Sequence, residues 1–164
     1  MESYKKLDIM DKKITYQNLL FVLSAALILF VCSCSLPRIV IFEDPLTAEE
    51  RINLGVAYEN KGEYDLAIKE YETASKKLAV GFLYLGNAYM RKGDFENAEY
   101  NYKKAIDEDD VMADAYNNLA WLYYERRINI KEAEELAMKA VELRPENTNF
   151  RDTLNKLKSL TPKK

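Results

Sequence analysis

Two cysteines and the absence of histidine limit the chemistry that this sequence can perform. Histidine is the commonest general base and the commonest metal ligand in proteins. Both cysteines, Cys32 and Cys34, end an apolar stretch, which leaves no thiol further along the chain for a metal cluster or a disulfide. The acidic run 107–110 lacks the glycine and the alternation of a calcium loop. We therefore expect no catalytic residue, no metal and no cofactor.

The charge balance argues against nucleic acid as a partner. The chain carries 24 Lys and Arg residues against 27 Asp and Glu, a net charge of −3, whereas nucleic-acid-binding domains normally show a basic face. With 164 residues, 48% hydrophobic and 31% charged, the composition fits one ordinary globular domain. The chain is not uniform, because residues 19–31 are uncharged and almost all apolar, whereas the sequence after Glu43 is charged and periodic.

The apolar segment from Leu19 to Val31 has the form of a secretory signal. It follows Lys12 and Lys13 and contains 13 residues. As a helix this length rises about 20 Å, less than the hydrocarbon core of a bilayer, which is roughly 30 Å thick. A basic start before an apolar core of about 7–15 residues is typical of a signal peptide.

The residues Val31-Cys32-Ser33-Cys34, directly after this apolar core, resemble the lipobox of bacterial lipoproteins. In that motif an aliphatic residue, a variable residue and a small residue precede the cysteine that is acylated. The resemblance makes Cys34 the candidate for lipidation. It implies that residues 1–33 are a signal peptide and that residues 34–46 are the lipidated cysteine and a tether.

The alternative is an uncleaved transmembrane helix. Continued through Leu36, the uncharged stretch reaches 18 residues, which is borderline for spanning a bilayer. Both readings place the remainder of the chain outside the cytoplasmic membrane. Ser35, rather than aspartate, after the lipidated cysteine resembles outer-membrane sorting in enteric bacteria. We therefore expect a membrane-anchored protein on the periplasmic face, with the outer membrane favoured over the inner.

The body of the chain repeats itself. Residues 53–67 read NLGVAYENKGEYDLA and residues 84–98 read YLGNAYMRKGDFENA. Leu, Gly, Ala, Tyr, Lys, Gly, an acidic residue, an aromatic residue and Ala coincide between the two segments. A third copy begins at Asn118 and continues to Pro145. Such self-similarity is the signature of a repeat architecture.

The copies resemble tetratricopeptide repeats, each of which is a pair of helices with a period of about 34 residues. The spacing is 34 residues from Gly86 to Ala120 and 31 residues from Gly55 to Gly86. The resemblance implies an all-α fold, a right-handed α-solenoid of three helix pairs, preceded by the signal or anchor helix. The pairs are expected at about 47–78, 79–112 and 113–145, with a capping helix and tail at 146–164.

The residue pattern supports paired helices. Each copy reads as two helices of about 12–14 residues with apolar positions three and four apart. Gly55 and Gly86 are small where the first helix of a pair must let its partner approach closely. Gly62 and Gly93 stand where the first helix stops, at a left-handed cap that glycine adopts without a steric penalty.

In tetratricopeptide proteins the first helix of each pair lines a concave groove. Carried over to this chain, the groove holds Glu49, Ile52, Val56, Glu59 and Asn60, then Leu83, Tyr84, Asn87, Met90 and Arg91, then Asn117, Asn118, Trp121, Tyr124 and Glu125. The residues that we predict to bind a partner are Tyr84, Asn87, Met90, Arg91, Asn117, Asn118, Trp121 and Tyr124.

Four of these residues suggest how a partner would be held. Asn87 and Asn118 occupy positions where related grooves hydrogen-bond the backbone of a bound peptide, since an amide side chain both donates and accepts. Trp121 and Tyr124 offer rigid aromatic area of the kind enriched at binding hot spots, although burial of Trp121 in the core is an equal alternative. We assign the other repeat tyrosines to packing: Tyr58, Tyr71, Tyr89 and Tyr102.

These features favour an adaptor that binds another protein. Ile52 and Leu83 stand where chaperone-binding relatives carry lysines that clamp a terminal carboxylate, so a carboxylate clamp is not expected. The segment from Asp44 through the repeats also resembles the repeat region found with C39-type cysteine peptidases, which suggests an envelope peptidase or assembly machine as the partner. The alternative is a pilot lipoprotein for an outer-membrane secretin or pilus system. An envelope enzyme is the third and least supported hypothesis.

Overall fold

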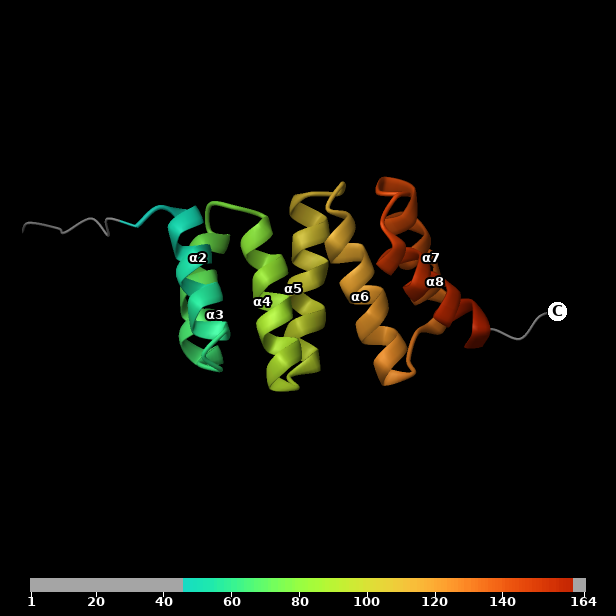
Figure 1. Ribbon diagram of the computed structural model, residues 1–164, viewed down its shortest axis with the longest axis horizontal. Coiled ribbons are helices and arrows are strands. Elements are labelled where there is room, and N and C mark those ends of the chain that lie inside the picture. Colours follow the sequence, from blue (N-terminus) through green and yellow to red (C-terminus); the bar gives the residue numbers. More distant parts are fainter. Residues whose placement is uncertain (1–45, 161–164) are drawn as a thin grey trace, which may run out of the picture. The chain divides into compact units, whose positions relative to one another are not determined.

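The computed structural model describes residues 46–160. The described residues all belong to one compact unit. The expected signal peptide, Cys34 and nearly all of the tether lie outside the described residues, as do residues 161–164. Between residues 46 and 160 every regular element is a helix, which confirms the all-α prediction (Figure 1). None of these helices is long and apolar enough to cross a membrane.

Seven helices make up the described part, as three hairpins and a final single helix (Figure 1). They are α2 (Ala48–Glu59), α3 (Tyr64–Ser75), α4 (Val80–Lys92), α5 (Phe95–Glu108), α6 (Ala113–Arg126), α7 (Ile130–Leu143) and α8 (Thr148–Leu160). The hairpins are α2–α3, α4–α5 and α6–α7, and each helix contacts the next one along the chain.

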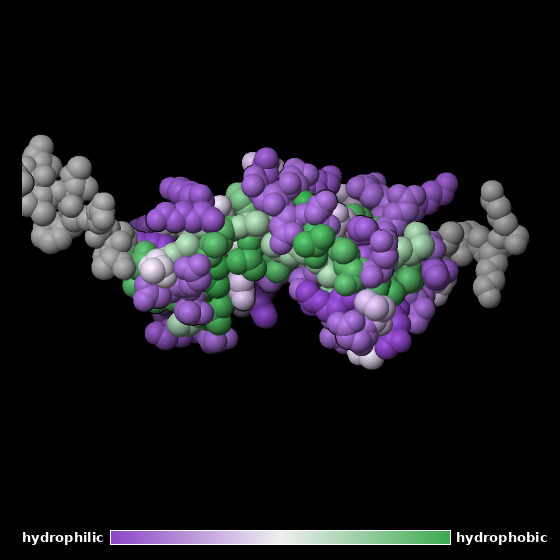
Figure 2. Space-filling view, turned by 90° about the horizontal axis from the view of Figure 1, so that it is seen from above, coloured by the Kyte–Doolittle hydropathy of each residue, from purple (hydrophilic) through white to green (hydrophobic). Residues whose placement is uncertain are grey.

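The first helices of the hairpins lie together on one side of the array. α2 contacts α4, α4 contacts α6, and α6 contacts α8, whereas among the described helices α3, α5 and α7 do not contact one another. In a curved array the helices on the inner side approach most closely, so α2, α4 and α6 form the inner layer. Seen along the helices in Figure 2, the array is indented along one long edge.

Local sequence signals set where the helices begin and end. The hydroxyl of Thr47 accepts from the backbone N–H of Glu50, and the Glu50 carboxylate accepts from the N–H of Thr47, which is a capping box. Gly93 has a φ of 76° and ends α4 in the left-handed region, as expected. In the third hairpin Arg127 and Asn129 take left-handed backbone angles instead, with φ of 54° and 48°.

Alanine and tyrosine side chains fill much of the core. Tyr71 and Tyr102 are fully or almost fully buried, at 0% and 2% exposure. Each ring lies directly against a glycine of its hairpin partner, Tyr71 against Gly55 and Tyr102 against Gly86. The third hairpin has Ala120 and Ala137 at the corresponding positions, both buried. The hairpins therefore fill this position in two ways. The first two pack a tyrosine ring against a glycine, and the third packs one alanine near another.

Candidate functional site

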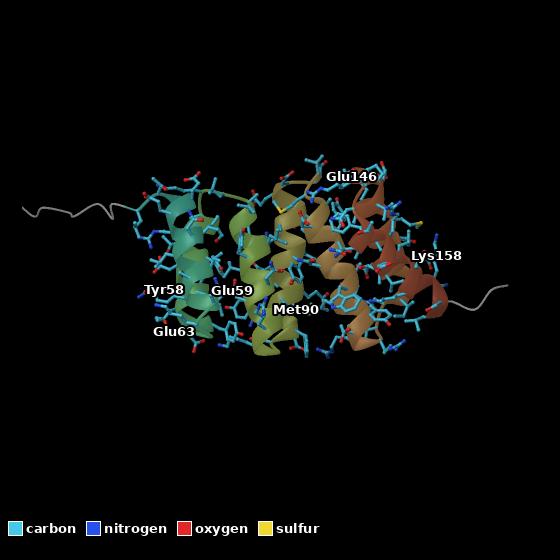
Figure 3. The ribbon with its side chains drawn as sticks, in the orientation of Figure 1. Tyr58, Glu59, Glu63, Met90, Glu146 and Lys158 are labelled. Carbon is cyan, nitrogen blue, oxygen red and sulfur yellow. The ribbon has the colours of Figure 1, made fainter. Side chains whose placement is uncertain are left out.

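A hollow lies on the inner layer of the array. It has a volume of about 370 Å³ and is lined by Glu59, Tyr84, Asn87, Met90, Arg91, Tyr102, Asn118 and Trp121. A second hollow, of about 690 Å³, shares Glu59, Tyr84 and Arg91 with the first and extends to Val56, Asn60, Lys61, Gly62 and Tyr64. Because they share these residues, the two hollows are adjacent, and we call them together the groove. Figure 3 shows Glu59 on α2 and Met90 on α4, the neighbouring helix.

Hydrogen bonds join three lining residues of the groove, Tyr102, Asn87 and Asn118, and extend from them to Asn117. The phenol of Tyr102 donates to Asn87 Oδ1 at 2.9 Å, and Asn118 Nδ2 donates to the same oxygen at 2.9 Å. Asn117 Nδ2 donates in turn to Asn118 Oδ1 at 3.4 Å. The network joins α4, α5 and α6. Within the described residues Asn87 Nδ2 has no acceptor, so its hydrogens remain available to a ligand.

Glu59 is the acidic residue of the groove. Its Oε2 accepts from the phenol of Tyr71 at 2.7 Å. Its Oε1 lies 3.5 Å from Arg91 Nε, and this buried oxygen receives no hydrogen bond from any described residue. The side chain of Glu59 is 14% exposed, whereas that of Arg91 is 66% exposed. The carboxylate is therefore held in place within the groove wall, and its ionic partner extends into solvent.

Burial keeps the phenols of Tyr71 and Tyr102 in their protonated, hydrogen-bond-donating form. Loss of water contact, reinforced by the hydrogen bond to Glu59, raises the pKa of Tyr71 far above its usual value. Burial also raises the pKa of Tyr102. Both phenols consequently remain donors across the physiological pH range.

Trp121 and Tyr124 form an aromatic pair at the C-terminal end of the groove. Their ring centroids are 5.1 Å apart and the planes are tilted by 30°. Lys156 Nζ, from α8, lies 4.6 Å from the Trp121 ring centroid, and the Arg127 guanidinium lies 5.1 Å from that of Tyr124. α8 thus borders the groove through Lys156, which the sequence analysis did not foresee.

The structure gathers most of the predicted binding residues in one place. Of the eight, the hollow is lined by Tyr84, Asn87, Met90, Arg91, Asn118 and Trp121. Asn117 and Tyr124 lie beside it without lining it: Asn117 contributes its amide to Asn118, and Tyr124 packs on the core and on Trp121.

Four further residues of the wider predicted groove line neither hollow: Glu49, Glu125, Ile52 and Leu83. Ile52 and Leu83 are 8% and 9% exposed and belong to the hydrophobic core. Each lies one helical turn before a groove residue, Val56 and Asn87, about 40° around the helix axis. That position is the edge of the groove face, where an aliphatic side chain stabilises the fold by turning into the core.

Sequence reasoning missed Tyr102 in the first hollow, and Lys61, Gly62 and Tyr64 in the second. We assigned Tyr102 to packing, and its ring is indeed buried. However, because the ring crosses a helix that has glycine at position 86, its hydroxyl reaches the far side and enters the hollow. The pairing of tyrosine with glycine across a hairpin is the sequence signal that could have revealed this.

The two tyrosine hydroxyls should differ in their contribution to stability. Tyr71→Phe removes a donor from a mostly buried carboxylate, for which we expect a loss of about 1.5–3 kcal/mol. Tyr102→Phe removes a neutral hydrogen bond to Asn87, for which we expect about 1 kcal/mol. Urea unfolding followed by circular dichroism measures both, and equal losses would contradict the role assigned to Glu59.

Comparison with protein-family models identifies the repeats. One model of the tetratricopeptide repeat matches residues 83–148, and a second model of the same repeat matches residues 51–76. The repeats of this chain are tetratricopeptide repeats. A search of curated proteins returned no significant match.

Solved tetratricopeptide repeat domains have the same fold. The first such domain of Spaghetti (RPAP3), bound to an HSP90 peptide, is 24% identical with a TM-score of 0.65, covering 73% of this chain and 97% of that one. The second domain of human RPAP3, in complex with an HSP70 peptide, is 23% identical with a TM-score of 0.61, covering 68% and 94%. The Sgt2 domain from Aspergillus fumigatus is 20% identical with a TM-score of 0.64, covering 69% and 78%.

Proposed function

We propose that this chain is a lipid-anchored adaptor of the bacterial cell envelope that holds a polypeptide segment of a partner protein in its groove. The observation that supports it most is the composition of the groove, where the aromatic rings of Tyr84 and Trp121 line the same hollow as Asn87, whose amide nitrogen has no acceptor among the described residues. Tetratricopeptide repeats typically serve as non-catalytic scaffolds for protein interaction, and RPAP3 domains of this fold are bound to peptides.

A polypeptide suits this groove better than a small metabolite does. The two adjacent hollows are open to solvent, and their lining residues extend from the α2–α3 turn to Trp121 and come from all three hairpins. An extended main chain presents carbonyl oxygens, to which Asn87 Nδ2 is able to donate. Tyr84 and Trp121 then supply rigid contact area for side chains on either side of that carbonyl.

The proposed anchor keeps the groove close to a membrane. Thr47, the N-cap of α2, lies 13 positions after an acylated Cys34. A chain of this length spans at most about 45 Å when fully extended. The adaptor would therefore meet partners that themselves lie at the envelope surface, such as a peptidase or an assembly machine.

Photocrosslinking in cells tests the proposal. The full chain carries a photoreactive phenylalanine analogue at Trp121, and a control variant carries it at Tyr100, which is 58% exposed on α5 and does not line the groove. We expect a specific protein adduct, identified by mass spectrometry, from position 121 and none from position 100. With Cys34→Ser, we further expect the protein to leave the membrane fraction and to lose incorporation of labelled palmitate. No adduct at 121, or identical adducts at both positions, would refute the adaptor; unchanged palmitate labelling would refute the anchor.

A further inference from the structure

We propose that the polypeptide bound in the groove inserts a basic side chain, lysine or arginine, whose charged end pairs with Glu59. This inference rests on the proposed function and names the chemistry of the partner.

The Glu59 carboxylate is incompletely satisfied. A carboxylate accepts about four hydrogen bonds, yet Glu59 receives only one from the described residues, from Tyr71. Its Oε1 is buried and lacks a hydrogen-bond donor among the described residues. A buried acceptor without a donor raises the free energy of the folded state, and Glu59 lines both hollows of the groove. A ligand that donates a hydrogen bond to this oxygen therefore gains more binding free energy than it would at a solvated carboxylate.

Arg91 does not supply the missing hydrogen bond to Glu59 Oε1. Its Nε lies 3.5 Å from Glu59 Oε1, beyond the usual range of about 2.7–3.2 Å for an N–H···O hydrogen bond. Its side chain is 66% exposed, so the guanidinium is largely hydrated. Lys61, the other cation of the groove, belongs to the turn after α2 and is exposed. Arg91 is thus able to swing into solvent while a ligand cation takes its place.

The surroundings of Glu59 suit the stem of a basic side chain. Tyr84, Met90 and Trp121 line the same hollow, and the Tyr84 ring centroid lies 5.2 Å from that of Tyr71. Methylene groups of lysine or arginine pack on such surfaces while the charged end reaches a polar partner. Aromatic faces also attract the cation itself. The chain already contains this arrangement at the end of the groove, where Lys156 lies over Trp121.

Selection from a random peptide library tests the inference. Full-length chain is immobilised and presented with displayed random dodecapeptides, in parallel with Glu59→Gln and Glu96→Gln variants. Glu96 is a matched control, because it too has an arginine nitrogen 3.5 Å away, Arg126 Nη1, but it does not line the groove. Wild type and Glu96→Gln should select peptides with lysine or arginine at one fixed position. Glu59→Gln, which retains an acceptor for the Tyr71 phenol, should select peptides without that preference.

Matched synthetic peptides measure how much affinity the basic residue contributes. Replacing the selected basic residue by glutamine should weaken binding to wild type about tenfold or more, and binding to Glu59→Gln less than about twofold, as the loss of one charge-assisted hydrogen bond requires. Arg91→Ala, a substitution at an exposed side chain, should strengthen binding because it removes the competing cation.

Four outcomes would contradict these proposals, in different ways. Selection of acidic residues, or weaker binding by Arg91→Ala, would overturn the basic-residue inference and leave the adaptor proposal in place. Peptides that bind Glu59→Gln with the same lysine preference would overturn it as well. If none of the selected peptides loses affinity for a Trp121→Ala variant, they do not occupy the groove, and the proposed function itself would be refuted.

Discussion

Replacing Gly86 by alanine should destabilise the repeat array by about 3 kcal/mol, the upper end of the usual cost of overpacking. An added Cβ would lie 2.3 Å from Cε1 and 2.4 Å from Cδ1 of Tyr102. The ring has little room to retreat, since it is 2% exposed and its hydroxyl is fixed by Asn87. Chemical denaturation followed by far-ultraviolet circular dichroism, on the full chain, measures the loss.

Gly93→Ala is the matched control for this prediction. It makes the same chemical change seven residues later on the same hairpin, but an added Cβ there meets nothing within 4 Å. Its cost is only that of a left-handed backbone, with φ of 76°, which is about 1 kcal/mol. The double variant Gly86→Ala with Tyr102→Ala, which copies Ala120 and Ala137 of the third hairpin, should lose less than the sum of its single changes. Equal losses for the two glycine variants would show that contact with Tyr102 is not the cause.

Leu157→Ala should cost about 3 kcal/mol and change the environment of the groove at the same time. Leu157 is completely buried at the contact between α8 and the core, and truncating a buried leucine typically costs about 2–5 kcal/mol. Weaker docking of α8 also withdraws Lys156 from the Trp121 ring. Trp121 is the only tryptophan in the chain, so its fluorescence reports this change directly.

The control for Leu157→Ala lies on the same helix. Lys158 is exposed on α8 near the far end of the array (Figure 3), and Lys158→Ala should change stability by no more than about 0.5 kcal/mol. Its tryptophan emission should match wild type. If Leu157→Ala lowers stability but leaves the emission unchanged, α8 does not determine the surroundings of Trp121.

The helix pairs and most lining residues of the first hollow could be predicted from the sequence, for identifiable reasons. Repetition of Gly86 and its neighbours fixes the helix phase, and the phase determines which side chains face inward. The helix phase does not determine whether a side chain at the edge of that face points into the groove or into the core. For this reason the prediction placed Ile52 and Leu83 in the groove, whereas they lie in the core. The phase also gives no indication that the Tyr102 hydroxyl passes beyond a glycine into the hollow.

Contacts between hairpins were the hardest to predict. The hydrogen bond from Asn118 to Asn87 and the position of Lys156 over Trp121 both depend on how one hairpin rotates on the next. That rotation is set by packing along the whole interface, and no local pattern records it. The signal peptide and the lipidation of Cys34 concern residues outside the described part of the chain, and they stay predictions.

The network of Tyr102, Asn87 and Asn118 has a consequence for the energetics of recognition. These side chains are already immobilised by one another before any ligand arrives. Ordering a mobile side chain at an interface typically costs about 0.5–1.5 kcal/mol of entropy. Binding avoids this cost here, because the side chains are already ordered in the folded protein. Such a preorganised surface discriminates by geometry, so ligands that require the amides to rotate should be rejected even when their overall composition is suitable.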